Sequence, residues 1–158
     1  MDGGIDAALA RLARRRLRGI HAPADFREAA RRALPRMVFD YVDGGAGSEA
    51  ALRRNRAALE AITLLPSGPA DVSAVDTGRI LFGQRLALPV VIGPTGLASA
   101  SWPRGEVALA RAAHTAGIPF VLANAASVAP EDIAMAAPGH AWFQLYPPPD
   151  ATIGRDWV

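Results

Sequence analysis

Three short apolar runs in the second half of the chain constrain the fold more than any other feature. Residues 89–93 and 119–123 are both nearly continuous apolar segments, and each ends in a turn that leads into a helical pattern. A third run, residues 140–146, follows the second helical pattern. Runs of this length and character are typical of buried parallel strands. The strand–helix–strand–helix–strand order therefore predicts an α/β fold with a parallel sheet.

The residues at the ends of these runs predict a binding surface. Ligands of parallel α/β proteins bind at the carboxyl ends of the strands, so the residues that follow the three runs should share one rim of the sheet. Gln144 is the most informative of them, because a glutamine inside an apolar strand needs a hydrogen-bond partner. The predicted rim residues are Pro94, Thr95, Gly96, Ala123, Asn124, Gln144 and Tyr146.

Proline and glycine punctuate the helices between the predicted strands. Pro103 and Gly117 bound a predicted helix over residues 103–116, because proline is favoured in a first helical turn and glycine directly after the last one. A second helix is predicted to begin near Pro130 and to end by Gly139.

The first half of the chain shows helical patterns. Residues 1–22 form a polar leader, and residues 23–87 are predicted to contain helices followed by a loop with a hairpin near 79–87. Asp25 and Glu28 have capping-box spacing, which predicts Asp25 as the N-cap of a helix through Leu34. Ser48 is the predicted N-cap of a later helix, whose apolar face carries Leu52, Leu59 and Ile62. Residues 88–158 then hold the first strand–helix units.

Composition excludes several kinds of chemistry. The chain has 158 residues, 51% of them hydrophobic and 20% charged, which is typical of a globular domain. It contains no cysteine, so it has no disulfide and no thiolate metal site. All 17 basic residues are arginine, which excludes mechanisms that need a lysine from this chain. His21, His114 and His140 lack metal-ligand spacing, and there is no convincing nucleic-acid motif. No apolar run is long enough to predict a transmembrane helix.

Four segments, in order along the chain, resemble the FMN-dependent 2-hydroxy-acid dehydrogenases and oxidases, and most of all the branch that oxidises mandelate, followed by those that oxidise lactate and glycolate. The similarity extends from about Asp25 to Tyr146. The segments are Leu-Pro-Arg-Met-Val-Phe-Asp-Tyr-Val-Asp-Gly-Gly-Ala (34–46), Leu-Pro-Val-Val-Ile-Gly-Pro-Thr-Gly-Leu (88–97), Ala-Gly-Ile-Pro-Phe-Val-Leu (116–122) and Trp-Phe-Gln-Leu-Tyr (142–146).

The resemblance implies the N-terminal part of a TIM barrel, with a helical leader and about three barrel strands. About 70 residues follow Pro89, whereas a complete barrel needs roughly 250, so the length alone also allows a small open sheet. FMN is the implied cofactor, at the carboxyl mouth of the barrel. By resemblance, Gln144 would bond the polar edge of the flavin, and the backbone of residues 94–96 would lie against its ring. Ala123 stands where the family usually has a serine that contacts the flavin. Asn124, the next residue, could partly replace that contact.

The resemblance also implies a small 2-hydroxy acid as substrate, mandelate-like or lactate-like, oxidised to the 2-oxo acid by hydride transfer to flavin. Tyr41 and Tyr146 would bind its carboxylate or hydroxyl. The catalytic histidine, lysine and arginines of the family have no counterpart here, so we predict no catalytic residue in this chain and little activity from it alone. The implied localisation is cytoplasmic, or peripheral on the inner face of the membrane.

Two alternatives remain open from the sequence. The chain could be an inactive half-barrel that needs a partner, either a second copy of itself or a missing C-terminal half. It could also belong to a related class of FMN barrels that act on isoprenoid diphosphates, although Tyr41 and the Gln144–Tyr146 triplet favour the hydroxy-acid branch.

Overall fold

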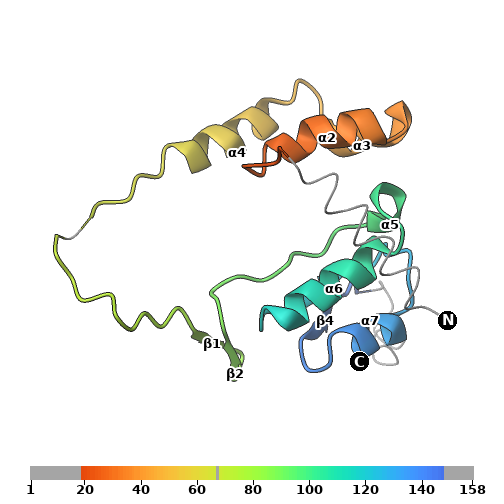
Figure 1. Ribbon diagram of the computed structural model, residues 1–158. Helices are drawn as coiled ribbons and strands as arrows, with labels where there is room; N and C mark the ends of the chain where they lie inside the picture. Colours follow the sequence, from red (N-terminus) through yellow and green to blue (C-terminus); the bar gives the residue numbers. More distant parts are fainter. Residues whose placement is uncertain (1–18, 67, 148–158) are drawn as a thin grey trace. The chain divides into compact units, whose positions relative to one another are not determined.

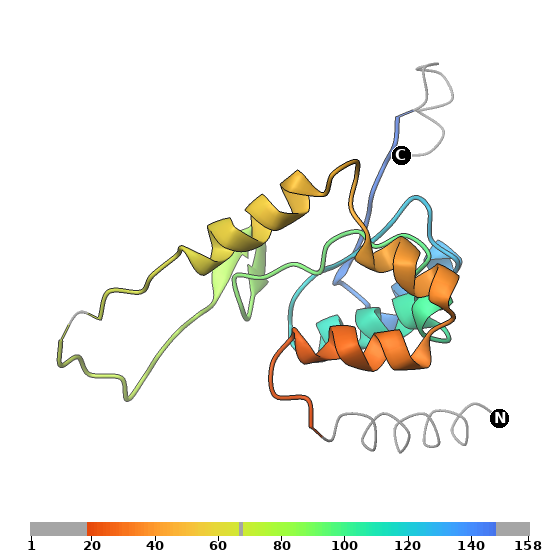
Figure 2. The same cartoon turned by 90° about the horizontal axis from the view of Figure 1, so that it is seen from above.

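A computed structural model describes residues 19–66 and 68–147, and the chain divides into two compact units, residues 1–66 and 67–158. Figures 1 and 2 show their helices and strands in two views. Most of the predicted polar leader, and the chain beyond Pro147, lie outside the described residues. The predicted boundaries at residues 22 and 87 remain predictions. Among the described residues no helix combines the length and the apolar character that crossing a membrane requires.

The first unit is helical, as predicted. It contains α2 (Asp25–Ala33), α3 (Arg36–Asp43) and α4 (Ala50–Glu60). Pro35 separates α2 from α3, because the residue before a proline is driven out of the helical conformation. Leu34 accordingly has an extended backbone, with a ψ of 150°.

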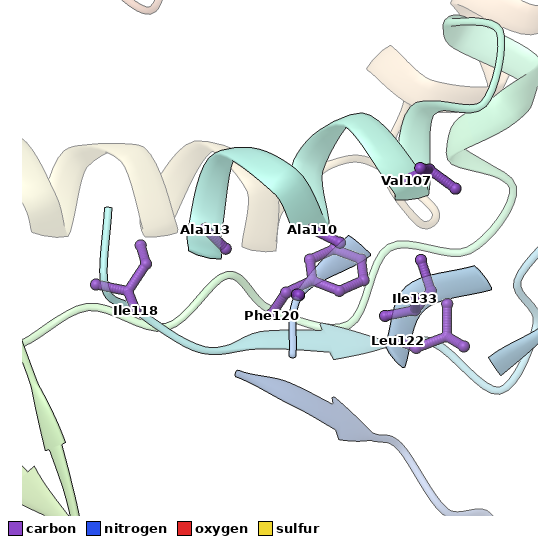
Figure 3. Close-up of a cluster of buried hydrophobic side chains, with 8 residues drawn as sticks. Val107, Ala110, Ala113, Ile118, Phe120, Leu122 and Ile133 are labelled. Carbon is purple, nitrogen blue, oxygen red and sulfur yellow. The ribbon is translucent and has the colours of Figure 1, made fainter. Parts of the chain in front are cut away.

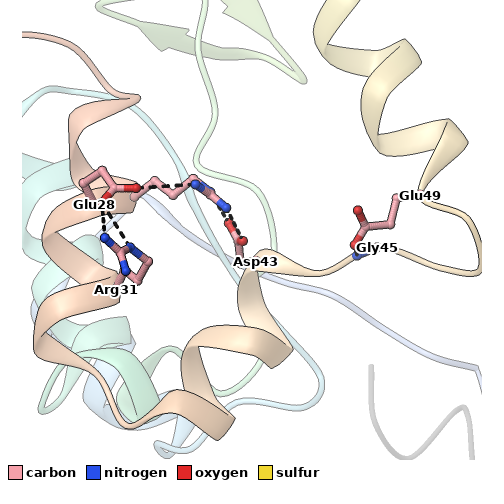
Figure 4. A network of polar contacts seen from close by, with 6 residues as sticks. Glu28, Arg31, Asp43, Gly45 and Glu49 are labelled. Carbon is pink, nitrogen blue, oxygen red and sulfur yellow. Dashed lines mark hydrogen bonds and ion pairs between the residues drawn. The ribbon is translucent and has the colours of Figure 1, made fainter.

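Both predicted N-caps of this unit are wrong. Asp25 is the first helical residue, and its Oδ2 accepts the N–H groups of His21 and Ala22, each at 2.8 Å, which precede the helix. Ser48 is replaced as N-cap by Glu49, whose φ of 58° lies in the left-handed region. The carboxylate of Glu49 instead accepts the backbone N–H of Gly45 at 3.2 Å (Figure 4). In both cases the side chain bonds backward along the chain.

An ion pair joins α2 to α3 (Figure 4). The Arg27 guanidinium donates to both carboxylate oxygens of Asp43, at 2.6 and 2.7 Å, and lies 5.8 Å from the centroid of the Phe39 ring. These hydrogen bonds hold the pKa of Asp43 below its ordinary value. Glu28, predicted as the second member of a capping box, bonds Arg31 instead.

The second unit begins with the predicted hairpin. Strands β1 (Arg79–Leu81) and β2 (Gln84–Leu86) pair antiparallel through a two-residue turn. Phe82 and Gly83 both have positive φ, 49° and 79°, which is the conformation that matches the twist of a hairpin.

The rest of this unit alternates helices and strands in the predicted order. It contains α5 (Ala98–Ser101), α6 (Gly105–Thr115), β3 (Phe120–Leu122), α7 (Pro130–Ala136) and β4 (Ala141–Phe143). Strands β3 and β4 are parallel, with Phe120 opposite Ala141 and Leu122 opposite Phe143. Ile92 forms an isolated parallel bridge to Phe120 on the other side of β3.

The predicted first strand is therefore a single bridge rather than a strand of five residues. Ile92 donates to the carbonyl of Pro119 and accepts the N–H of Val121, both at 3.0 Å. Pro94 has no N–H to donate to the carbonyl of Val121, and Pro119 has none to donate to the carbonyl of Val90, so the next ladder hydrogen bond is missing in both directions. The backbone at Ile92 therefore runs parallel to β3 at one bridge, on the side opposite β4.

The predicted helix over residues 103–116 is also shorter than expected. It begins at Gly105, and Pro103 lies in the turn that separates it from α5. Gly117 ends it as predicted, with a φ of 65°.

The core of this unit lies between α6, α7 and β3. In Figure 3 the side chains of one face of α6 point toward the strand and toward Ile133 of α7. The buried cluster consists of Val107, Ala110, Ala113, Ile118, Phe120, Leu122, Ile133 and Ala137. Small alanines on α6 let the helix approach the strand closely, while the larger side chains fill the space that remains.

Candidate functional site

The hairpin covers the amino ends of the parallel strands. Gln84 donates to the carbonyl of Gly139 at 2.8 Å, just before β4, and Ala87 donates to the carbonyl of Gly117 at 3.0 Å, just before β3. The Phe82 ring lies 5.8 Å from the ring of Trp142. The carboxyl ends of the strands, by contrast, lead into exposed residues. The predicted rim is therefore the accessible end of this sheet.

The loop after the first strand and the loop after β3 are joined directly. We call residues 93–97 the first rim loop and residues 123–128 the second rim loop. The N–H of Leu97 donates to the carbonyl of Ala125 at 3.2 Å. A Cβ at Gly96 would lie 3.4 Å from that same carbonyl oxygen, so glycine suits the close approach of the two loops.

Gln144 joins β4 to the second rim loop, and it has the partners that its position required. Its Oε1 accepts the backbone N–H of Asn124 at 3.2 Å, and its Nε2 donates to the hydroxyl of Tyr146 at 3.2 Å. One Nε2 hydrogen and further acceptor capacity on Oε1 are not used by these two bonds. The amide therefore connects two strand ends and retains a donor and an acceptor.

Within the second unit, the structure brings the predicted site residues together at this rim. Residues 94–96 are exposed, whereas Ala123 is buried at the end of β3. Tyr146 follows β4 and is 58% exposed. Tyr41 lies in the first unit, on α3, and is 74% exposed, so it does not form a core contact there.

Glu106 is the one charged residue buried among those described, and it was not among the predicted site residues. It lies in the first turn of α6 and is only 1% exposed. Its Oε2 accepts the hydroxyl of Ser99, and its Oε1 accepts the backbone N–H of Ser127 at 3.2 Å. Burial acts to raise the pKa of this carboxyl, but hydrogen bonds from Ser99, from the backbone of Glu106 itself and from Ser127 lower the pKa below its ordinary value. The feature of the sequence that could have predicted this buried glutamate is the Gly105-Glu106 pair at the start of α6.

The two histidines of the second unit do not lie at this rim. His114 near the end of α6 and His140 just before β4 face each other with their Nδ1 atoms 3.2 Å apart, at the amino end of the strand. His21 belongs to the first unit. Within residues 19–66 and 68–147 no group of three or more His, Asp or Glu side chains could hold a metal ion.

Comparison with known families identifies the family of the chain. The sequence model of the FMN-dependent dehydrogenase family matches residues 30–158. The chain belongs to this family. The predicted resemblance is confirmed, and FMN is the cofactor of the family.

Individual members of the family are similar over most of the chain. The (S)-mandelate dehydrogenase of Pseudomonas putida is 44% identical over 122 residues, which are 77% of this chain and 31% of that protein. The L-lactate dehydrogenase of Caulobacter sp. (strain K31) is 44% identical over 137 residues, 87% of this chain and 36% of that protein. The chain thus spans about a third of the length of these relatives.

A solved structure is similar in fold as well. A mandelate oxidase variant with a C4a-OH-FMN adduct superposes with a TM-score of 0.77 at 40% identity, covering 84% of this chain and 40% of that one. The mandelate dehydrogenases and oxidases are TIM barrels, so the predicted fold class is confirmed at the level of a partial barrel.

The rim residues fit one side of a flavin. The first rim loop presents exposed backbone, which a flat ring can approach closely at Gly96. Gln144 keeps an amide donor and an acceptor, which matches the alternating donors and acceptors of a flavin edge.

Proposed function

We propose that this chain supplies the N-terminal part of an FMN-dependent oxidoreductase that converts an L-2-hydroxy acid, mandelate-like or lactate-like, to the 2-oxo acid. The observation that carries the proposal is the rim: three aligned strand ends whose loops are bonded to one another and exposed. Family membership supports the proposed chemistry, and the exposed rim supports the proposed location of the site.

The proposed cofactor contacts follow from this geometry. The backbone of Pro94, Thr95 and Gly96 would lie against the ring, and Gln144 would bond its polar edge. Ala123 is buried, so its contribution would be limited to close packing beneath the ring. A bound FMN would supply the acceptor for the hydride that leaves the carbon carrying the substrate hydroxyl.

The proposed substrate contacts are Tyr146 and Tyr41. The hydroxyl of Tyr146 accepts a hydrogen bond from Gln144, which leaves its own O–H free to donate to a substrate carboxylate. A charge-assisted bond of this kind is stronger than a neutral one, so it would orient a hydroxy acid. Tyr41 is proposed for the same carboxylate or hydroxyl.

We propose that the chain alone has little or no turnover. Removal of the hydroxyl proton needs a base close to the reacting carbon. His114 and His140 lie at the amino end of the sheet, away from the rim, and the sequence contains no lysine. The rim would therefore bind and orient the flavin and the hydroxy acid, but the described residues of the rim include no general base.

Completion by further strands is part of the proposal. Among the described residues β4 pairs only with β3, so its other edge presents unpaired N–H and C=O groups. We propose that this edge pairs with the remaining part of a barrel, or with a second copy of the chain. Size-exclusion chromatography with and without the C-terminal two thirds of a relative separates the two arrangements.

The proposed location is the cytoplasm or the inner face of the membrane.

The direct test is flavin binding by the purified chain, measured by quenching of FMN fluorescence. Gln144→Leu should weaken binding by about tenfold, because it removes hydrogen bonds worth ~1 kcal/mol or more. Gln84→Leu is the matched control, since it makes the same change in the hairpin at the opposite end of the sheet. Equal effects of the two changes would contradict the proposed site.

Activity is tested by adding L-mandelate or L-lactate to the FMN-loaded chain without oxygen. We expect the flavin absorbance near its visible maximum to stay unchanged over the time of the assay. Bleaching by the chain alone would contradict the proposal that it lacks a base.

A further inference from the structure

The two rim loops are held together from behind as well as directly. At the surface, the N–H of Leu97 donates to the carbonyl of Ala125. Glu106 is buried, and its carboxylate bonds both α5, which follows the first rim loop, and the second rim loop. One carboxylate oxygen accepts the hydroxyl of Ser99, which lies in α5 two residues after the end of the first rim loop. The other accepts the N–H of Ser127 in the second rim loop. A single side chain therefore contacts both segments from the start of α6.

Gly105 makes this geometry accessible. A Cβ at this position would lie 2.7 Å from the carbonyl oxygen of Ala98, a distance that real Cβ atoms do not adopt. The absence of a side chain lets α5 pack on the first turn of α6. Ser99 thereby comes within hydrogen-bond reach of Glu106. Gly105 and Glu106 therefore act together: the glycine leaves room for α5, and the glutamate accepts a hydrogen bond from Ser99 of α5.

A carboxylate suits the position because both its partners donate. The N–H of Ser127 can only donate, and the hydroxyl of Ser99 is placed to donate to the second oxygen. No described side-chain polar atom that is buried lacks a hydrogen-bond partner, and each carboxylate oxygen of Glu106 has one. Removing it would leave the Ser127 N–H without its acceptor, which costs more than the bond itself contributes.

We infer that Glu106 is a positioning residue: it braces the first and second rim loops against each other and so fixes the surface on which a flavin is proposed to lie. The inference rests on the proposed function for its consequence, flavin affinity. The contacts of Glu106 with the loops exist without any ligand. The bracing of the loops and its effect on flavin affinity can therefore be measured separately.

The brace is tested by amide hydrogen exchange on the full chain without FMN. Glu106→Ala should accelerate exchange at Ser127 and Leu97 by about tenfold, as expected for the loss of one hydrogen bond and its neighbour. Amides of β3, such as Leu122, should change much less. Ile118→Val is the matched control, since it trims a buried side chain at the opposite end of β3 and should leave the rim amides unchanged.

Two further variants keep the test decisive if Glu106→Ala does not fold. Glu106→Gln retains an acceptor for Ser127 and can donate to Ser99, so its rim exchange should lie between that of the wild type and that of Glu106→Ala. Ser99→Ala removes only the α5 contact and should loosen Leu97 more than Ser127. Unchanged rim exchange in Glu106→Gln, Glu106→Ala and Ser99→Ala would overturn the brace.

The consequence is tested by FMN titration of the same variants. Glu106→Ala should bind FMN about tenfold more weakly, the scale seen when a supporting partner behind a binding site is lost. Ile118→Val should bind like the wild type. Faster rim exchange with unchanged FMN affinity would overturn the link to flavin binding. A wild-type chain that binds no FMN would refute the proposed function, while the exchange pattern would still decide the brace.

Discussion

Two leucines show how differently the two units of this chain are built. Leu122 in β3 is 2% exposed and lies in a cluster of buried side chains, whereas Leu59 in α4 is 72% exposed. The difference is general. Among the described residues of the first unit only Phe39 is a buried apolar side chain, while the second unit has a continuous core. The large exposed apolar side chains of the first unit are Phe26, Met37, Tyr41, Val42, Leu52, Leu59, Ile62, Leu64 and Leu65.

This contrast separates helix formation from burial. The helices of the first unit are supported by local interactions: a proline boundary, the Arg27–Asp43 pair and the Glu28–Arg31 pair. Such surface pairs contribute little to stability. Extended apolar exposure is typical of surfaces that pack against another surface. The second unit is stabilised by its own core, whereas most of the large apolar side chains of the first unit are exposed.

The largest effect should come from removing core volume. Leu122→Ala should lower the free energy of unfolding by about 2–5 kcal/mol, because it leaves a cavity between α6, α7 and β3. Leu59→Ala makes the same chemical change on an exposed face and should stay within about 0.5 kcal/mol of the wild type. All three tryptophans lie in residues 67–158, so urea unfolding followed by fluorescence reports on the second unit. Far-UV circular dichroism then follows the helices of both units. Equal losses for the two leucines would remove the contrast.

A smaller effect should come from backbone crowding inside the second unit. Gly105→Ala places a Cβ against the Ala98 carbonyl and should cost about 1–3 kcal/mol. Gly93→Ala is the matched control, because a Cβ there would meet nothing within 4 Å. That control should be neutral or slightly stabilising, since alanine restricts the unfolded chain more than glycine. Thermal unfolding of both variants checks the difference, and a destabilised Gly93→Ala with an unaffected Gly105→Ala would contradict it.

The smallest effect should appear in the first unit as a pH dependence. Arg27 lowers the pKa of Asp43 in the folded chain, so this carboxyl stabilises the folded state above its unfolded pKa of about 3.9. The stabilisation is lost as the pH falls from there through the lower folded pKa. Asp43→Asn should reduce the acid-induced loss of helical circular dichroism in this window and leave tryptophan fluorescence unchanged. Arg27→Gln should have the same effect, and an unaltered acid titration in both variants would show that the pair does not support the helices.

Local sequence patterns predicted the elements of the second unit well. The apolar runs located three parallel segments, and Gly117 and Pro130 marked where α6 ends and α7 begins. Periodicity and turn chemistry act over a few residues, so they can be read without knowing the fold. The wrong predictions also concern single residues at the ends of helices. At Asp25 and Ser48 the N-cap was assigned one residue away from where the backbone turns.

The candidate site was only partly predictable. The position of the rim followed from the general rule for parallel strands, and the need of Gln144 for a partner followed from its apolar surroundings. The identity of that partner, the Asn124 N–H, depends on the register between β3 and β4. Glu106 was missed because a glutamate in a first helical turn normally faces water.

By itself, then, the sequence determined the order of strands and helices, the family and the rim on which its chemistry would take place. The tertiary structure alone decided that the run before Pro94 forms one bridge, that the hairpin covers the amino end of the sheet, and that Glu106 lies buried between two loops. Local patterns encode the conformation of neighbouring residues. Contacts between residues twenty or more positions apart arise only when the strands pair and the helices pack over them.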